Sequence, residues 1–332
     1  MALALSRRRF ITFAAVAAGL PLLFTAGRAQ AGLVRWRGTA LGAPAEIQLY
    51  HRDETVAHQA ISAALAELRR LERVFSLVRA DSAISQLNRE GRLNEAPADL
   101  VVMLERALSL AKISDGVYDP TVQPLWNLYY RHFAAAAPDP AGPPASARAA
   151  ALALVDWRQV EVDRSTLRIA FARPGMGLTL NSGAQGYITD KVTDVLRAHG
   201  FERMLVDMGE PRALAAKPDG TAWRIGIANP ADRQETVASF DVVDKCIATS
   251  GGYGTILDEA GSFTHIFNTR DGSTAPAMSS VSVIAKTGIA ADGLATAMLM
   301  VPTHRREAVL RAGGGEQAIF VTPQGVVATV NA

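Results

Sequence analysis

Three motifs rich in hydroxyl, glycine and carboxylate residues lie within one short stretch of the chain. They are T-S-G-G-Y (Thr249 to Tyr253), T-H-I-F-N-T-R-D-G (Thr264 to Gly272) and A-D-G-L-A-T-A (Ala291 to Ala297). Hydroxyls, glycines, one histidine and a carboxylate in this order suit the handling of phosphate and of a metal ion. This stretch is therefore the first candidate for a functional site.

Asp292 and Thr296 are the candidate metal ligands. They are four residues apart, so on a helix both oxygens project from the same face. Hard oxygen ligands suit Mg²⁺, which takes one or two protein carboxylates and completes its shell with water and phosphate oxygens. Each residue also has a structural interpretation. Asp292 could cap the start of a helix, and the hydroxyl of Thr296 could donate to a backbone carbonyl one turn earlier in the helix.

The T-S-G-G-Y motif is a candidate phosphate site. Thr249, Ser250 and Gly251 offer two hydroxyls and successive amides on a flexible backbone, which suits a pyrophosphate. A simple strand-to-loop turn that holds its own backbone is the alternative.

Earlier blocks of the sequence complete a family pattern. Together with the three motifs, and in the same order and approximate spacing, they resemble the FAD:protein FMN transferases of the ApbE family over nearly the whole chain after residue 31. No single block would be decisive. The earlier blocks are F-S-L-V-R-A-D-S-A-I-S-Q-L-N (Phe75 to Asn88), Y-D-P-T-V-Q-P-L-W (Tyr118 to Trp126) and L-N-S-G-A-Q-G-Y-I-T-D (Leu180 to Asp190).

The resemblance implies a role for each matched residue. Asp292 and Thr296 would bind Mg²⁺ together with a backbone carbonyl at about Ser182, and His265 would take the proton of an acceptor hydroxyl. Taken alone, His265 would usually be interpreted as a structural residue. Asp119 precedes Pro120, so its alternative interpretation is a role in forming a turn. The residues implied to contact FAD are Tyr118, Asp119, Thr179, Gln185, Thr249, Ser250, Gly251 and Ile266.

Three positions differ from the residues most common in the family. Gln185 stands where lysine is usual, and it donates a hydrogen bond but cannot neutralise phosphate charge. Thr179 stands where aspartate is frequent, and Val78 where tyrosine is frequent. The motifs remain intact around all three.

The implied activity is Mg²⁺-dependent transfer of FMN from FAD to a Thr or Ser hydroxyl of a partner protein, with release of AMP. The implied partners are exported, membrane-associated respiratory electron-transfer flavoproteins. A pyrophosphatase that converts FAD to FMN and AMP stays open, because water needs only an empty acceptor cleft. A periplasmic flavin-binding protein without turnover also stays open, although the metal pair and the base argue against it.

The first 31 residues have the features of a twin-arginine export signal. Ser6-Arg7-Arg8-Arg9-Phe10-Ile11 is followed by an apolar stretch to Phe24, and Ala29-Gln30-Ala31 offers a cleavage site. The apolar stretch is shorter than the roughly 20 residues of a spanning helix, so cleavage is favoured over anchoring. The expectation is a periplasmic mature protein that starts at Gly32.

Composition excludes one class of partner. The formal charge of the chain is +2, and the predicted leader holds four arginines and no acidic residue, which leaves −2 for the mature protein. This near balance argues against nucleic acid as a partner. Cys246 is the only cysteine, so an intrachain disulfide is impossible, and its apolar surroundings predict a buried, inert thiol.

The elements expected around these motifs predict an α+β fold. Separate helices and β-hairpins follow one another along the chain, and no regular βαβ repeat is present. Helical periodicity is clearest over 54–74, and helices are also expected over 97–113, 186–199, 290–300 and 304–312. Strands are expected within 34–50, 157–171, 204–207, 223–228, 237–243, 280–285, 318–322 and 326–330. The resemblance implies one ApbE-like, T-fold-like catalytic domain over 32–332, and residues 133–151, rich in alanine and proline, are expected to form a surface insertion.

Overall fold

A computed structural model describes residues 31–274 and 279–332 of the chain. Residues 1–30, nearly all of the predicted leader, lie outside the described residues. Among the described helices, none has the length and apolar character needed to cross a membrane.

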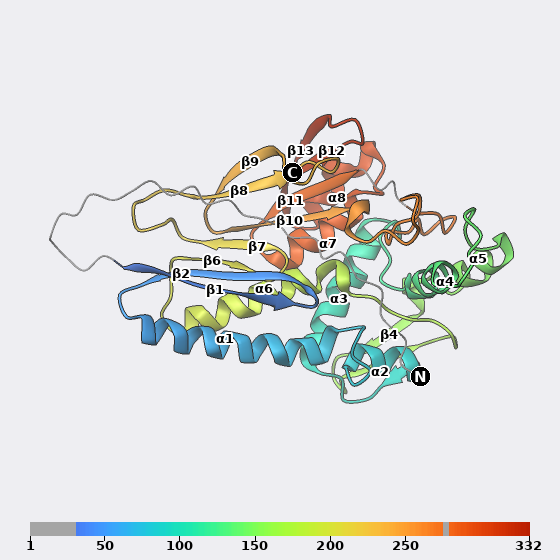
Figure 1. Cartoon of the computed structure of the whole chain (residues 1–332). Coiled ribbons are helices and arrows are strands. Elements are labelled where there is room, and N and C mark those ends of the chain that lie inside the picture. Colours follow the sequence, from blue (N-terminus) through green and yellow to red (C-terminus); the bar gives the residue numbers. More distant parts are fainter. Residues whose placement is uncertain (1–30, 275–278) are drawn as a thin grey trace.

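One large antiparallel sheet organises the molecule (Figure 1). Its strand order is β1-β2-β6-β7-β10-β11-β12-β13, and every neighbouring pair is antiparallel. The strands are β1 (Gly32–Ala40), β2 (Ala43–His51), β6 (Met204–Asp207), β7 (Pro211–Leu214), β10 (Lys245–Gly251), β11 (Ser280–Ala285), β12 (Gly315–Val321) and β13 (Val327–Asn331).

Alternation along the strands gives this sheet two apolar faces. In β6, Val206 belongs to the core beneath the helices, whereas its neighbour Leu205 packs on the opposite face. The same alternation separates Ala248 from Ile247 in β10. Each strand of the centre is therefore buried on both sides, between helices and a covering hairpin.

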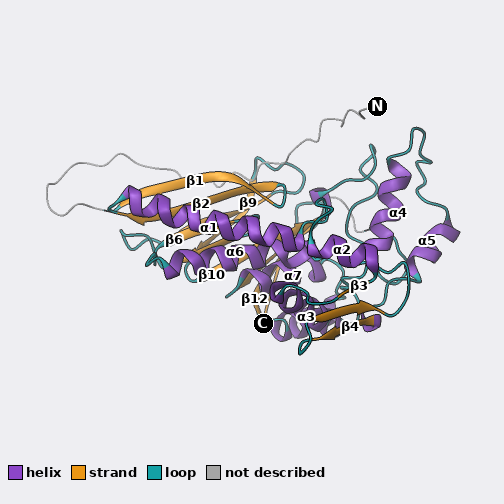
Figure 2. Cartoon of the chain, turned by 90° about the horizontal axis from the view of Figure 1, so that it is seen from below, coloured by secondary structure: helices purple, strands orange, loops and turns teal. Residues whose placement is uncertain are grey.

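Helices cover one face of the sheet. Figure 2 shows α1 (Glu54–Phe75), α6 (Asn181–Ala198) and α7 (Gly288–Met298) lying over the strands. α1 begins at Asp53, whose carboxylate accepts from the amides of Thr55 and Val56, and it buries a stripe of apolar residues at helical spacing. The other helices are α2 (Ala83–Glu90), α3 (Ala98–Ile113), α4 (Gln123–Phe133), α5 (Ala145–Leu152) and α8 (Arg306–Ala312).

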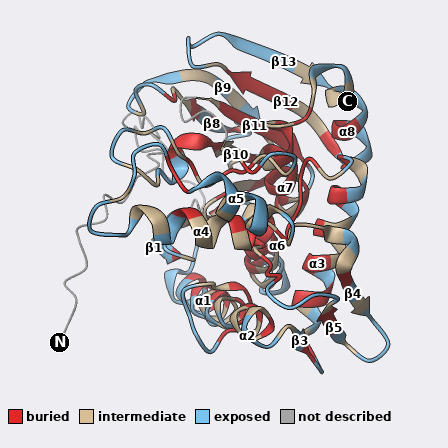
Figure 3. Cartoon of the chain, turned by 90° about the vertical axis from the view of Figure 1, so that its right-hand side faces the viewer, coloured by how far each residue is buried: buried red, intermediate tan, exposed pale blue. Residues whose placement is uncertain are grey.

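Two smaller sheets complete the fold. The hairpin of β8 (Trp223–Ala228) and β9 (Thr236–Val242) covers the second face of the main sheet with Trp223, Ile225 and Ile227. A three-stranded sheet has the order β3-β5-β4, formed by β3 (Arg92–Leu93), β5 (Arg168–Phe171) and β4 (Val160–Asp163). Figure 3 shows buried residues concentrated between the helices and the main sheet, while β13 and the loops are largely exposed.

The predicted α+β class and the mostly antiparallel sheets are confirmed, and several boundaries needed correction. The hairpin over 157–171 forms, but Trp157–Gln159 is a 3₁₀ turn ahead of β4. The helix expected over 186–199 is preceded by a turn at 181–183 that is included in α6, and non-helical backbone angles at Ser182 and Gly183 make a kink between this turn and the regular helix. α2, α4, β7 and β10 were not predicted. Within 133–151, α5 begins and buries no residue, whereas Gly142 and Pro143 ahead of it are buried, and the surface insertion stays a prediction.

Candidate active site

α7 carries both predicted metal ligands and is held in place from outside itself. Its N-cap residue, Thr287, makes no side-chain capping bond. Instead Asp190 on α6 accepts from the amides of Gly288 and Ile289, at 2.7 and 3.0 Å. Arg212 on β7 completes the arrangement with a 2.6 Å ion pair to Asp190. A carboxylate at a helix N-terminus also stabilises the helix dipole, so the N-terminus of α7 is fixed by α6 and, through Arg212, by β7.

α6 and α7 pack backbone to backbone beside Asp292. A Cβ at Gly186 would overlap the carbonyl of Gly288, and a Cβ at Gly288 would overlap the carbonyl of Gly186. This close approach lets the amide of Gly186 donate to Asp292 Oδ2 at 3.0 Å. Two glycines are therefore required at the crossing that positions the predicted carboxylate ligand.

The remaining predicted ligands lie on the same side of α7. Thr296 Oγ1 shares a 2.7 Å hydrogen bond with the hydroxyl of Ser250 at the end of β10. Ser182 lies in the kink of α6, and its carbonyl would be 3.5 Å from a Cβ at Gly293 on α7, next to Asp292. The structure thus brings Ser182, Ser250, Asp292 and Thr296 to one junction between α6, α7 and β10.

The donor set at this junction fits a hard divalent cation. One carboxylate, one hydroxyl and one backbone carbonyl are oxygen ligands of the kind Mg²⁺ binds. Asp292 Oδ1 has no hydrogen-bond donor among the described residues, so this oxygen is free to bind a cation. Burial raises the pKa of Asp292, and a bound cation would hold the carboxylate ionised. Among residues 31–274 and 279–332, no group of three or more His, Cys, Asp or Glu side chains is arranged to hold a metal ion.

The T-S-G-G segment ends a strand and is not a free loop. Thr249 to Gly251 pair with β11, and the chain then turns through a 3₁₀ turn, Gly252–Gly254. The amide of Thr249 donates to Glu210 Oε2 at 3.0 Å, and its hydroxyl bonds to that of Ser282 at 2.7 Å. Ser250 is consequently the residue of this motif that reaches the junction of α6, α7 and β10.

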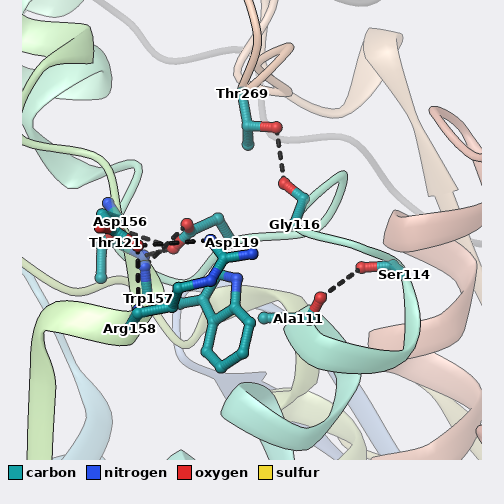
Figure 4. Close-up of polar contacts among 9 residues, drawn as sticks. All are labelled: Ala111, Ser114, Gly116, Asp119, Thr121, Asp156, Trp157, Arg158 and Thr269. Atoms are coloured by element: carbon teal, nitrogen blue, oxygen red, sulfur yellow. Dashed lines mark hydrogen bonds and ion pairs between the residues drawn. The ribbon is translucent and has the colours of Figure 1, made fainter.

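The Tyr118-Asp119 pair lies in a buried loop after α3. Tyr118 contacts the junction, because Ser182 Oγ donates to its hydroxyl at 2.9 Å. Asp119 is occupied by its own loop (Figure 4): one oxygen accepts from the amide and hydroxyl of Thr121, and the other from the amide of Trp157. The carboxylate of Asp119 thus organises the loop, as expected for an Asp that precedes proline.

His265 and Ile266 lie on the loop that follows β10. His265 as a whole residue is half-buried, and its Nδ1 lies 3.2 Å from the carbonyl of Thr255. A side chain at Gly254 would meet the ring at 3.1 Å, so the T-S-G-G-Y turn and His265 pack together. Burial lowers the pKa of His265 below its ordinary value, which favours the neutral imidazole. Ile266 is buried beside it.

Comparison with known proteins identifies the family of the chain. Residues 41–320 match the ApbE family. The chain belongs to the ApbE family. The FAD:protein FMN transferase of Treponema pallidum is 30% identical over 308 residues, which cover 85% of this chain and 83% of that protein. One from Klebsiella pneumoniae is 27% identical over 85% of this chain and 87% of its own length.

Solved structures agree with this assignment. The apo crystal structure of the Pseudomonas stutzeri flavinyl transferase ApbE superposes with a TM-score of 0.75 and 26% identity, covering 91% of this chain and 95% of that one. The Vibrio cholerae flavin transferase ApbE, at 24% identity and a TM-score of 0.76, shares the fold. The family predicted from the motifs, the fold and the assignment as a transferase are therefore confirmed.

The three departures from the ApbE pattern lie in different surroundings. Gln185 lies on α6 with its amide against Gly209, where a Cβ would overlap it. Thr179 donates its amide to the carbonyl of Pro120, beside the Asp119 loop. Val78 is 86% exposed in the loop after α1, so an apolar side chain faces solvent where the family often has tyrosine. The predicted FAD contacts of Thr179 and Gln185 stay predictions.

Asp190, Arg212 and Glu210 hold the elements of the candidate site in place and were not predicted. Asp190 ends the L-N-S-G-A-Q-G-Y-I-T-D block, so its position in a matched motif was the available signal. Arg212 lies 22 residues further along the chain and carries no local pattern. Glu210 belongs to Asp207-Met208-Gly209-Glu210, a segment to which sequence alone assigned no role.

Proposed function

We propose that this chain is a Mg²⁺-dependent FAD:protein FMN transferase that attaches FMN to a Thr or Ser hydroxyl of a partner protein and releases AMP. Membership of the ApbE family supports the reaction class. The observation that carries the metal dependence is the pairing of Asp292 and Thr296 on one face of α7, beside the Ser182 carbonyl. FAD is the donor substrate in this proposal.

The metal would be held by Asp292, Thr296 and the carbonyl of Ser182. When bound, Mg²⁺ would neutralise the negative charge that develops on the pyrophosphate oxygens. Asp190 and Arg212 keep the N-terminus of α7 fixed, so the carboxylate and the hydroxyl need no rearrangement during the reaction. Ser250, bonded to Thr296, would donate to a phosphate oxygen.

His265 would act as the general base. With its Nδ1 proton directed at the carbonyl of Thr255, the lone pair of Nε2 is free to accept the proton of the acceptor hydroxyl. The hydroxyl oxygen then bonds to the phosphorus of the FMN moiety. The bond from that phosphorus to the bridging oxygen breaks, and AMP leaves with that oxygen. The product is a phosphoester between FMN and the acceptor.

We further propose that the protein acts in the periplasm after twin-arginine export. The leader motif, Ser6-Arg7-Arg8-Arg9-Phe10-Ile11, supports this proposal. Exported, membrane-associated respiratory proteins that carry a flavin domain would then be the acceptors, since they share the compartment.

Incubation of the protein with FAD and Mg²⁺, with and without an exported flavin domain as acceptor, tests the proposal by mass spectrometry. A covalent mass gain of FMN on the acceptor, lost when its Thr or Ser is changed to Ala, is the expected result. Free FMN and AMP with an unmodified acceptor would instead identify a pyrophosphatase. Unchanged FAD in both reactions would identify a flavin-binding protein without turnover.

A further inference from the structure

The loop that carries His265 has apolar support of its own. Among the described residues, Leu125, Tyr129 and Phe267 form a buried cluster that is separate from the two clusters packed on the main sheet. The described residues of this third cluster come from α4, α5, the chain next to these helices and loop 255–274, and none of them lies in a strand of the main sheet. Figure 1 shows α4 and α5 at the right-hand end of the molecule. α7, which carries the proposed metal ligands, packs in the main core instead.

Four residues, Tyr129, Phe133, Phe263 and Phe267, form an aromatic cluster between α4 and this loop. The ring centroid of the fully buried Tyr129 lies 5.7 Å from that of Phe263 and 5.3 Å from that of Phe267. The centroid of Phe133 lies 5.0 Å from that of Phe263. Aromatic pairs at these separations attract each other beyond the burial of their area. Phe263 and Phe267 are each two residues from His265, so the ring contacts hold the chain on both sides of the histidine.

The end of the loop is seated on the same helices. The hydroxyl of Tyr129 donates to the carbonyl of Gly272 at 2.9 Å. Gly272 has a φ of +71°, and a Cβ at this position would lie 3.0 Å from the side chain of Arg148 on α5. Thr269 Oγ1 donates to the carbonyl of Gly116 at 2.6 Å (Figure 4). The loop is thus fixed to α4, to α5 and to the chain that follows α3.

His265 itself lies in a short hairpin within this loop. The amide of His265 donates to the carbonyl of Thr255 at 3.2 Å, and the amide of Leu257 donates to the carbonyl of Phe263 at 2.9 Å. The carboxylate of Asp258 closes the turn by accepting from the amide of Phe263 at 2.8 Å. Because these bonds fix the hairpin internally, a shift of Phe263 would move His265 with it.

Residues 133–151 contribute a contact to the same hairpin. Gly142 has a φ of +91°, and a Cβ at this position would lie 2.8 Å from the ring of Phe263. Both the backbone angle and the close approach favour glycine at this position. The segment predicted to form a surface insertion therefore packs against the loop that carries His265.

We propose that Tyr129 and Phe263 are positioning residues of the transfer reaction, which hold loop 255–274 so that His265 reaches the acceptor hydroxyl. This inference rests on the proposed function, in which His265 is the base. Misplacement of a catalytic group by about 1 Å can cost on the order of 10²-fold in rate. The metal ligands have separate support, so weakening the aromatic cluster is expected to slow transfer and to leave the binding of metal and FAD unchanged.

Titration of His265 tests the structural step without any substrate. Burial is the main cause that lowers the pKa of His265 below 6.5. In Phe263→Ala the loop loses its ring contacts and water reaches the imidazole, so nuclear magnetic resonance of histidine-labelled protein should show this pKa rising toward 6.5. Phe240→Ala on β9 is the matched control, because it also removes a half-buried phenylalanine, but one that packs on the face of the main sheet opposite to α7. It should leave the pKa unchanged.

Transfer kinetics of the same variants test the consequence. Phe263→Ala is expected to lower kcat about tenfold or more, with wild-type affinities for FAD and Mn²⁺. Phe263→Leu keeps apolar bulk and should recover most of the rate, and Phe240→Ala should transfer FMN as fast as the wild type. Tyr129→Phe removes only the hydroxyl that bonds to Gly272. It carries the test if Phe263→Ala does not fold, and it should change the pKa and kcat in the same directions, by less.

Three results would overturn the proposal. They are an unchanged pKa of His265 in both Phe263→Ala and Tyr129→Phe, a wild-type kcat in a variant whose pKa has shifted, and a loss of kcat in Phe240→Ala as large as that in Phe263→Ala. If the wild-type protein forms no FMN adduct on the acceptor, the proposed function fails. The histidine titration then decides by itself whether Tyr129 and Phe263 hold His265.

Discussion

The carboxylate of Asp292 has two separable tasks. Oδ2 accepts from the Gly186 amide, and Oδ1 is the oxygen proposed to bind the metal. Asp292→Asn keeps an acceptor for that amide but removes the charge, so we expect loss of Mg²⁺-dependent transfer with a nearly unchanged midpoint of thermal unfolding. Asp292→Ala also leaves the Gly186 amide without its partner, which costs about 1–3 kcal/mol of stability.

Mn²⁺ binding followed by electron paramagnetic resonance, together with thermal unfolding, separates these two tasks. If Asp292→Asn unfolds as early as Asp292→Ala while still binding Mn²⁺, the carboxylate serves the helix crossing and not the metal.

His265 sets an expectation for the pH dependence of transfer. As a base it must be neutral, and burial holds its pKa below the ordinary value of 6.5. Activity should therefore persist as pH falls to 6.5 and decline only below it, as the imidazole becomes protonated. His265→Ala should slow transfer by roughly 10²–10⁴ with FAD affinity unchanged. Equal losses of FAD affinity and rate in His265→Ala would make the residue a ligand contact.

Sequence alone located several site residues because their signal is local. Asp292 and Thr296 are four apart on one helix, and their same-face placement follows from helical geometry. The partners of α7 carry no such signal: Asp190 lies 98 residues before Gly288 along the chain. Only the packing of α6 against α7 brings them together, and no local periodicity encodes that packing.

Among the elements, α7 depends on Asp190 for its position. Asp190→Ala removes two hydrogen bonds at the helix N-terminus and leaves Arg212 buried without its partner. Breaking a buried ion pair in this way costs about 3–5 kcal/mol, so the urea midpoint should fall sharply. Asp190→Asn keeps a hydrogen-bond acceptor for α7 and should lose less stability.

The free energy of unfolding does not report whether α7 keeps its position, so Mn²⁺ affinity is measured as well. We expect Mn²⁺ affinity to fall in Asp190→Asn even at temperatures where the variant is fully folded, because α7 is held less firmly. The exposed pair Arg311–Glu307 offers the control: Glu307→Gln should change neither quantity. If the folded Asp190→Asn variant binds Mn²⁺ as tightly as the wild type, Asp190 contributes to stability and not to the position of the metal ligands.

The elements differ in how well sequence predicts them. α1 was evident because a long amphipathic stripe repeats over many turns. β10 was missed because Thr249-Ser250-Gly251-Gly252 has the composition of a turn, yet pairing with β11 keeps Thr249 to Gly251 extended. Tertiary pairing overrode local propensity there, as strands often show.

For the whole molecule, the leader predicts the compartment. Replacing Arg7 and Arg8 with Lys together should leave the protein in the cytoplasm with residues 1–31 attached, because the twin arginines are the feature that the export machinery reads. Fractionation and intact-mass measurement follow the outcome, with Arg28→Lys as control. Normal export and cleavage of the doubly substituted chain would point to a different route.

The burial of α7 has a consequence for how the chain acquires its catalytic competence. Nine of its eleven residues are buried, and most of these are glycine or alanine, which gain little from packing until α6 and the sheet are both in contact with them. Their amides should exchange with deuterium only through global unfolding. The metal ligands would then exist only in the completely folded chain, so a partly folded chain could not capture Mg²⁺. A protein exported in the folded state would cross the membrane with this centre already assembled.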